Sequence, residues 1–160
     1  MTTEYLFPTS GLAGDGGSSA LATLSTSSAE RDELLGVDIA SLADLDPQLR
    51  LVGGRAVLAQ DLVHRFETPA GGLFYDDSYG YDLRALLNAA LDERDAPGIE
   101  AACEAQCLLD ERVLAVRAAV TLLRAESRLR VGIAVECATG TFSFTLGVSE
   151  VSVEVLEILT

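Results

Sequence analysis

Few side chains in this sequence are of the types that carry out chemistry, and their spacing predicts structural roles for them. The single histidine, His64, has no second histidine to share a metal, and a catalytic triad would need further partners beside it. Cys103 and Cys107 lie four residues apart and share a helix face, but zinc sites use tighter spacing and a second half-site. Cys137 completes no known pattern. We therefore expect buried thiols, no metal site and no cofactor.

Carboxylates are the remaining candidates for catalysis. A glycosidase needs two acids held several ångströms apart, one of them with a raised pKa. Asp76 with Asp77, or Glu67 with Asp82, could form such a pair, but the sequence shows no apolar pocket that would raise either pKa. Asp76-Asp77-Ser78 is better explained as a turn. Paired glycines lack the Lys-Ser/Thr context of a phosphate-binding loop; they stand at 16–17, 53–54 and 71–72. We expect no catalytic residue.

The first element that positions these residues is a helix over 55–66. Leu58, Leu62 and Phe66 recur four residues apart, which predicts an amphipathic helix with one apolar stripe. Thr68-Pro69 ends it, because the residue before a proline is pushed out of the helical region.

A short link and two more helices follow. Leu73-Phe74-Tyr75 predicts a short extended piece. Asp82 is the expected N-cap of a second helix. Asp95 and Pro97 suit the start of a third helix, which runs to about Leu109.

After Arg112 the period of the apolar residues changes from 3.6 to 2, which predicts strands. The alternating series are Leu114-Val116-Ala118-Val120-Leu122, Leu129-Val131-Ile133-Val135-Cys137, Phe142-Phe144-Leu146-Val148 and Val151-Val153-Val155. Short connections permit only antiparallel neighbours, and half-polar alternation fits a sheet with one solvated face. The predicted fold class is α+β, with about three helices packed on one face of a C-terminal four-stranded antiparallel sheet.

The composition sets the class of partner. The chain has 160 residues, 49% hydrophobic, enough for one domain with a real core. Its net charge of -14 repels phosphates, so we expect no nucleic-acid partner and no docking on anionic membranes. The first ten residues contain Glu4 and no basic region, so no signal peptide is expected. An odd number of cysteines favours a reducing compartment.

Three segments follow from these patterns. Residues 1–30 are rich in Gly, Ser, Thr and Ala and predict an arm that is flexible or ordered only by a partner. Residues 31–54 predict an irregular segment wrapped on the core, with a turn at Asp46-Pro47. Residues 55–160 form the expected α+β domain.

The stretch from Gly54 to Asn88 carries an ordered set of motifs. Its helix leads into Thr68-Pro69-Ala70-Gly71, an extended link, an acidic turn, Tyr79-Gly80 and Asp82-Leu83-Arg84. This order resembles the gene 25-like baseplate wedge family of contractile phage tails and related injection systems, whose members are often labelled lysozymes. The family opens its sheet with Glu-Pro-Arg and an apolar residue. This chain has Asp110-Glu111-Arg112-Val113 there, with Glu111 where the family has proline.

The resemblance, over about 37–160, implies a structural protein and not an enzyme. It implies a wedge component that surrounds the tail tube and templates the first sheath ring through strand addition between subunits. The implied partners are other baseplate wedge proteins, the tail sheath and the tail tube or hub, in multiple copies of a six-fold assembly. The implied location is the virion tail baseplate or a phage-tail-like particle, assembled in the bacterial cytoplasm.

The expected partner contacts lie at two places. In the last strand, Val151, Val153, Val155 and Ile158 would pair with another chain. At the start of the sheet, Asp110, Glu111 and Arg112 would contact a neighbour, with Arg112 binding a carboxylate through two hydrogen bonds.

Alternatives remain at each level. Arg112 could form an internal ion pair with Asp82 or Asp110, and the last strand could be an ordinary solvated edge. At the level of function, the alternatives are a peptidoglycan-degrading muramidase and a stand-alone tail-assembly adaptor.

Overall fold

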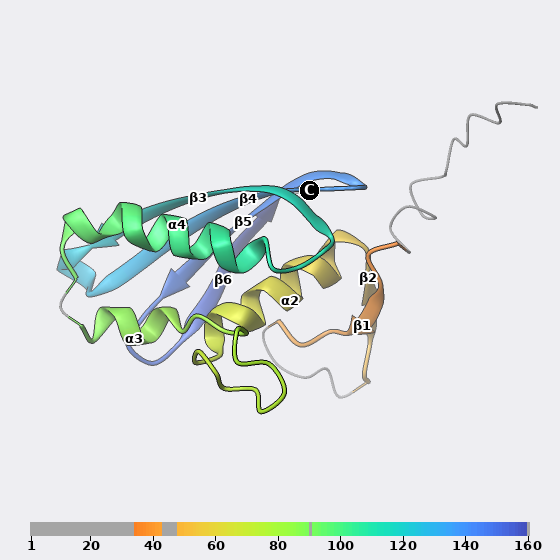
Figure 1. The fold of residues 1–160 in the computed structure, drawn as a ribbon, viewed down its shortest axis with the longest axis horizontal. Coiled ribbons are helices and arrows are strands. Elements are labelled where there is room, and N and C mark those ends of the chain that lie inside the picture. Colours follow the sequence, from red (N-terminus) through yellow and green to blue (C-terminus); the bar gives the residue numbers. More distant parts are fainter. Residues whose placement is uncertain (1–33, 43–47, 90, 160) are drawn as a thin grey trace, which may run out of the picture.

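The structure, a computed structural model, describes residues 34–42, 48–89 and 91–159 and has the α+β fold (Figure 1). The predicted arm at 1–30 and the predicted turn at Asp46-Pro47 lie outside these residues. Helices cover one face of a four-stranded sheet, as the change of apolar period from 3.6 to 2 predicted.

The sheet is an antiparallel meander in the C-terminal part of the chain. Its strands are β3 (Val113–Leu123), β4 (Arg128–Cys137), β5 (Gly140–Val148) and β6 (Val153–Leu159), joined in the order β3-β4-β5-β6. A 3-10 turn, η2 (Arg124–Glu126), connects β3 to β4. Because each strand pairs with the next one along the chain, β3 and β6 are the two edges of this sheet.

Alternation along the strands separates a buried face from a solvated one. In the central strands β4 and β5 every second side chain is buried, and these are Leu129, Val131, Ile133, Val135, Cys137, Phe142, Phe144, Leu146 and Val148. The residues between them, such as Arg130 and Glu136, are exposed on the other face. The predicted alternation in these two strands is confirmed.

Each edge strand contains one extra residue that the alternation did not predict. In β3, Val113 pairs with Cys137 and Ala115 with Glu136, so Leu114 bulges out and is 63% exposed. Its expected place in the inward series is therefore wrong, and Val113 is buried instead. In β6 the extra residue is Leu156, which lies between the paired residues Val155 and Glu157.

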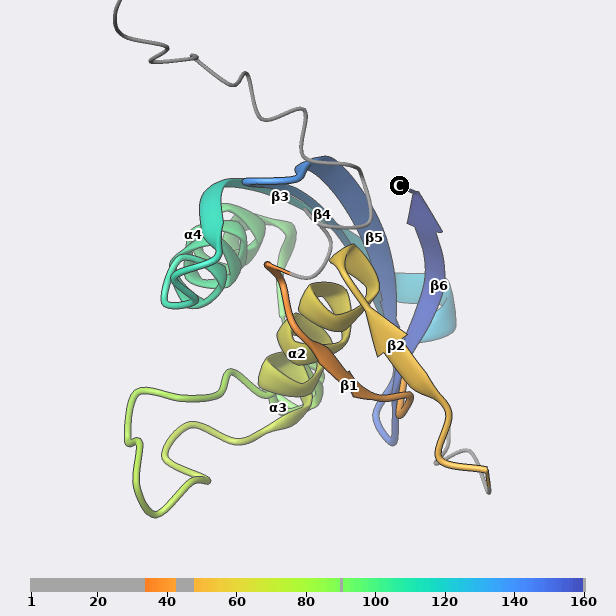
Figure 2. The ribbon, with the colours of Figure 1, turned by 90° about the vertical axis from the view of Figure 1, so that its right-hand side faces the viewer.

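In the described part of the chain, three helices pack on the buried face of the sheet. They are α2 (Arg55–Glu67), α3 (Leu83–Leu87) and α4 (Ala96–Cys107), the last preceded by the 3-10 turn η1 (Glu93–Asp95). The sheet curves around α2, as Figure 2 shows. Leu58, Leu62 and Phe66 of α2 are fully buried, as their spacing predicted. Within the described ranges, no helix has the length and apolar character needed to cross a bilayer.

The segment before α2 forms a small hairpin against that helix. Strands β1 (Val37–Ile39) and β2 (Leu51–Gly53) pair antiparallel, and Leu35 just before β1 is buried in the core. Gln60, a buried polar residue of α2, accepts from the backbone of Ser41 at 2.9 Å and donates to the backbone of Ile39 at 2.9 Å. The sequence predicted an irregular segment here, because strands of three residues are too short to show alternation.

Candidate partner-binding site

Two Asp-x-Arg motifs build the same local structure at two places. In each, the aspartate accepts from the backbone N–H of the arginine two residues later and from its guanidinium. Asp82 in this way caps the N-terminus of α3, as predicted. Asp110 does the same just before β3. In both motifs the spare guanidinium N–H groups then reach a distant part of the chain.

Arg112 joins three segments of the molecule. It donates to Asp110 and to Asp61 of α2, with N···O distances of 2.7 Å, and its Nη1 donates to the backbone carbonyl of Leu35 at 2.9 Å. The hydrogen bond to Asp110 is the main cause that raises the pKa of Arg112. Of the alternatives open for Arg112, the internal pair with Asp110 is present, and Asp61 is a partner that the sequence did not indicate. Asp82 pairs with Arg84 instead.

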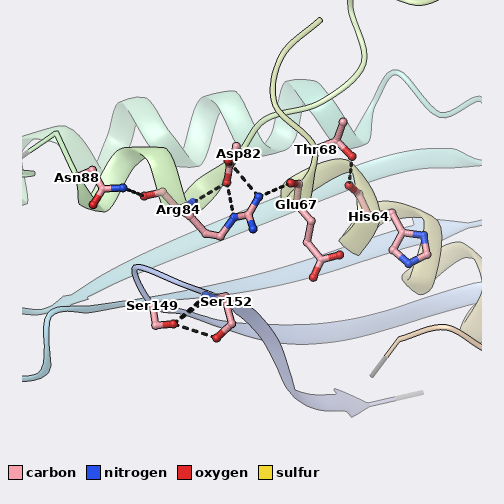
Figure 3. A network of polar contacts seen from close by, with 8 residues as sticks. All are labelled: His64, Glu67, Thr68, Asp82, Arg84, Asn88, Ser149 and Ser152. Atoms are coloured by element: carbon pink, nitrogen blue, oxygen red, sulfur yellow. Dashed lines mark hydrogen bonds and ion pairs between the residues drawn. The ribbon is translucent and has the colours of Figure 1, made fainter. Parts of the chain in front are cut away.

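Arg84 joins α3 to the end of α2 (Figure 3). Its Nη2 donates to the backbone carbonyl of Glu67 at 2.8 Å, so this carbonyl at the C-terminus of α2 is satisfied. Thr68 closes the same helix end by donating its hydroxyl to the carbonyl of His64 at 2.7 Å. These contacts give the motif residues Thr68 and Asp82 structural roles.

The other motif residues close the neck of a loop that spans 69–81. Gly71 N donates to the carbonyl of Tyr79, and Tyr81 N donates to the carbonyl of Arg65 at 2.8 Å. Gly80 has a φ of 104°, and a Cβ there would lie 2.6 Å from the carbonyl oxygen of Pro69. Tyr79 stacks under the guanidinium of Arg65, 4.4 Å from the ring centre. The motif therefore specifies a closed, cross-linked loop.

The tip of this loop differs from the prediction. The expected extended piece at Leu73-Phe74-Tyr75 is wrong, because Asp76 N bonds back to the carbonyl of Leu73 and turns the chain. Phe74 is 95% exposed and Tyr75 71% exposed. The predicted turn at Asp76 is present, since its Oδ1 accepts from the backbone and the hydroxyl of Ser78. The tip thus presents two adjacent aromatic rings to solvent.

Two of the candidate acids, Asp76 and Asp82, lie in surroundings that lower their pKa. Hydrogen bonds from the side chain and backbone of Ser78 lower the pKa of Asp76. Burial alone would raise the pKa of Asp82, but hydrogen bonds from Arg84 outweigh it and lower the pKa overall. The carboxylate of Glu67 points away from Asp82 in Figure 3. A general acid needs a raised pKa, so Asp76 and Asp82 are poorly suited to that role.

The thiols and the histidine are held in structural surroundings. Burial raises the pKa of both Cys103 and Cys107 to about 12, which leaves them protonated and unreactive. Cys137 is buried and donates to the carbonyl of Gly140. His64 Nε2 lies 3.4 Å from the hydroxyl of Ser41. Among the described residues, no group of three His, Cys, Asp or Glu side chains is placed to hold a metal ion.

The β3 edge of the sheet is closed by two carboxylates from α4. Glu104 accepts from the backbone N–H of Ala118 at 3.0 Å, and Glu100 accepts from that of Val120 at 2.9 Å. The two glutamates are one helical turn apart, so they match two donors that are two residues apart on the strand. An incoming strand would have to displace both carboxylates to pair with β3.

The β6 edge has no such closure among the described residues, where β6 pairs only with β5. The backbone N–H of Ala118 points away from β4 to Glu104. Ala118 and Ile133 are therefore a non-hydrogen-bonded pair. A residue whose backbone points away from one neighbouring strand points toward the other. Ile133 and Phe144 are therefore a hydrogen-bonded pair, and Phe144 and Ile158 are a non-hydrogen-bonded pair. The backbone groups of Ile158 therefore point outward, and the same register applies to Val153 and Val155.

The predicted contact residues of the last strand thus have two roles. The side chains of Val153, Val155 and Ile158 are half-buried against the core, while their backbone groups are directed to the outer edge of the sheet. The expected place of Val151 in the last strand is wrong, because β6 begins at Val153 and Val151 lies in the turn before it, 84% exposed. Asp110 and Arg112 lie in the internal network, and Glu111 is exposed beside them.

Comparison with known protein families and with curated proteins identifies no relative. No protein-family model matches the chain. No curated protein matches it in sequence. The expectations that follow from the motif order therefore depend on the residues and contacts described above.

Sequence reasoning missed the two residues that close the β3 edge and so make it differ from the β6 edge. Glu100 and Glu104 lie four apart on the expected third helix, and that spacing was the only available signal. Nothing in the sequence showed that these side chains reach the backbone of Ala118 and Val120, because the contact depends on how the helix lies along the strand.

Proposed function

We propose that this chain is a structural subunit of a contractile-tail baseplate wedge that joins a neighbouring chain by β-strand addition at β6. The observation that carries the proposal is the difference between the two sheet edges. Carboxylates occupy the outward N–H groups of Ala118 and Val120 on β3, whereas no described residue occupies those of β6. Free backbone donors and acceptors along an edge are the template for strand addition.

The side chains of β6 hold the strand in place and limit which strand can pair with its edge. Val153, Val155 and Ile158 keep the strand on the core, so its backbone is ordered before a partner arrives. Glu154 and Glu157 project to the solvated face, where they discourage pairing between identical acidic edges and favour a partner strand with basic residues. This arrangement supports adhesion to one kind of neighbour.

The wider identity depends on the order of the motifs between Gly54 and Val113. The resemblance to the wedge family rests on Thr68-Pro69-Ala70-Gly71, Tyr79-Gly80 and the Arg112 that opens the sheet. In the structure these residues close the end of α2, the neck of the 69–81 loop and the start of β3. We therefore propose the tail sheath, the tube and other wedge proteins as partners, in a six-fold particle. The lowered pKa values of Asp76 and Asp82 speak against either of them as the general acid of a muramidase.

A pair of substitutions at Val155 tests the attachment. Val155→Pro removes one outward N–H from β6 without removing a hydrogen bond to β5, and proline is tolerated on edge strands. Val155→Thr keeps both the N–H and the β-branched shape. With the chain co-expressed beside its neighbouring sheath and wedge genes, we expect Val155→Pro to lose co-purification of the partner and Val155→Thr to retain it.

The particle itself provides the second readout. Cryo-electron microscopy of assembled particles should place the chain around the base of the tube, with β6 continued by a strand of another chain. A partner that binds the Val155→Pro variant as well as the wild type would refute strand addition at this edge. Clearing of a peptidoglycan suspension by the purified chain, abolished by Asp76→Asn or Glu67→Gln, would replace the proposal with the muramidase.

A further inference from the structure

We propose that the tip of the 69–81 loop is a second docking point, which inserts Phe74 and Tyr75 into an apolar pocket of a protein partner whose rim carries Arg or Lys. This surface is separate from the β6 edge. In both ribbon views the loop projects beyond α2 on the side away from the sheet (Figures 1 and 2). The proposed partner at this tip is a different chain from the one whose strand pairs with β6.

The exposure of the two rings is the first step of the argument. Phe74 is 95% exposed and Tyr75 71% exposed, and they contact each other edge to face with ring centres 4.9 Å apart. They form one apolar knob that no described part of the chain covers. Phe and Tyr are enriched at the cores of protein interfaces, and Tyr is among the residues that contribute most binding energy when they fill a partner's pocket.

The second step is the rigidity of the loop that carries the rings. Its neck is closed by the hydrogen bonds from Gly71 to Tyr79 and from Tyr81 to Arg65. Its tip is turned by Asp76, and Gln106 of α4 donates to the carbonyl of Ser78. An ordered loop loses little conformational entropy when it binds, so this knob is organised before it meets a partner.

The third step is charge, which selects the partner. Asp76 and Asp77 directly follow the two rings, and hydrogen bonds from Ser78 keep Asp76 ionised by lowering its pKa. Asp77 is exposed beside it. Two carboxylates next to an aromatic knob favour a pocket edged by Arg or Lys. They oppose insertion into an anionic lipid surface, which carries the same sign of charge.

The first experiment identifies what the rings touch. The photoreactive residue p-benzoyl-phenylalanine replaces Phe74 in the full chain, which is irradiated in cells that express its neighbouring genes, and the adducts are mapped by mass spectrometry. Leu114, exposed on another surface, is the matched control position. We expect one protein, labelled at an apolar segment flanked by Arg or Lys, from position 74 and not from position 114.

Further variants test the charge and separate the two surfaces. Asp77→Lys should reduce the yield of the adduct at least about fivefold, and Val155→Pro should leave that yield unchanged, because β6 binds a different chain. Once the labelled protein is purified, Phe74→Ala and Tyr75→Ala should each weaken its binding at least about tenfold. Tyr75→Phe should bind like the wild type. The four loop variants should keep the wild-type thermal midpoint, since these side chains are outside the core.

Three results would overturn the proposal. One is the absence of any adduct from position 74, or equal adducts from positions 74 and 114. Another is an adduct that Asp77→Lys leaves unchanged. The third is flotation of the purified chain with phosphatidylcholine or phosphatidylserine vesicles that Phe74→Ala abolishes, which would make the knob a lipid anchor. Loss of the β6 partner in Val155→Pro with the adduct intact would show that the two surfaces act independently.

Discussion

At the scale of single residues, two arginines connect segments that are distant in the sequence. Arg84 links the start of α3 to the carbonyl of Glu67 at the end of α2, and Arg112 links the start of β3 to Asp61 and to Leu35. Each is oriented by an aspartate two residues before it, so that little side-chain freedom remains to be lost. Both motifs place an ionised carboxylate where folding depends on its charge.

The Asp110 carboxylate predicts a loss of stability in acid. Burial acts to raise its pKa, but hydrogen bonds from Arg112 outweigh burial and hold the pKa below the ordinary 3.8. Because the folded-state pKa is lower than the unfolded one, the stabilisation is complete above about pH 5 and is lost as the pH falls through the folded-state pKa. Urea unfolding from pH 7 to pH 2 should show this decline, with a smaller slope in Asp110→Asn.

The Asp110→Asn variant should also be less stable than the wild type at pH 7, because an amide cannot pair with the Arg112 charge. Asp77→Asn is the control, since Asp77 is exposed on the loop. An Asp110→Asn variant with the same pH dependence as the wild type would contradict this role.

Gly80 predicts a second effect at the residue scale. Its φ of 104° is unfavourable for any residue with a side chain, and a Cβ would lie 2.6 Å from the carbonyl oxygens of Thr68 and Pro69. We expect Gly80→Ala to lower the free energy of unfolding by about 2 kcal/mol or more. Gly98 lies in α4, where an added Cβ would have no atom within 4 Å, so Gly98→Ala should raise it by about 0.5 kcal/mol. Denaturant midpoints compare the two, and equal effects would contradict the tight neck.

At the scale of elements, helix α4 has two faces with two functions. Ile99, Cys103 and Cys107 are buried against the sheet, and Glu100 and Glu104 extend along the neighbouring face to the free edge of β3. Natural sheets protect their edges against pairing with other chains, and here a helix supplies the protection through side-chain acceptors. Among the described residues, β6 is therefore the edge of the sheet without such protection.

Removal of the two glutamates should expose the β3 edge. The outward N–H groups of Ala118 and Val120 would then be available to the β6 edge of a second copy. We expect Glu100→Ala with Glu104→Ala to associate with itself in a concentration-dependent way, measured by sedimentation velocity. Glu93→Ala with Glu126→Ala removes the same charge from exposed sites and should behave like the wild type. Association of both double variants alike would attribute the effect to charge and not to the edge.

At the scale of the whole molecule, the core joins the inner face of the sheet to α2, α3 and α4. Leu58, Leu62 and Phe66 of α2, Leu83 of α3 and Cys103 of α4 belong to the same buried cluster as the inward residues of the strands. The thiols of Cys103 and Cys107 are inaccessible in this cluster, and burial raises the pKa of each to about 12. Their reactivity therefore reports on the opening of the core.

Alkylation should follow global unfolding. In the native protein at pH 8, iodoacetamide should modify Cys103 and Cys107 slowly, and the rate should rise with urea in parallel with the loss of circular dichroism. A single exposed cysteine in Ala101→Cys, on the outer side of α4, is the control and should react at once. Rapid modification of Cys103 in the absence of urea would mean that α4 detaches locally.

The sequence by itself determined the main helices and the strands of the meander, though not the β1-β2 hairpin, because apolar periodicity depends only on which face of each helix or strand is buried. The stripe from Leu58 to Phe66, the N-cap at Asp82 and the alternation of β4 and β5 were predictable for this reason. The bulges at Leu114 and Leu156 were not, since an extra residue is defined by the pairing of a strand with its neighbour.

Only the tertiary structure decided which surfaces are available to partners. The closure of β3 by Glu100 and Glu104, the junction of Asp61, Asp110 and Arg112, and the exposure of Phe74 each join or separate residues far apart in the chain. An apolar pattern in the sequence records that a residue prefers burial. Whether a backbone donor or an aromatic ring is in fact covered depends on the packing of elements against one another, which local patterns do not encode.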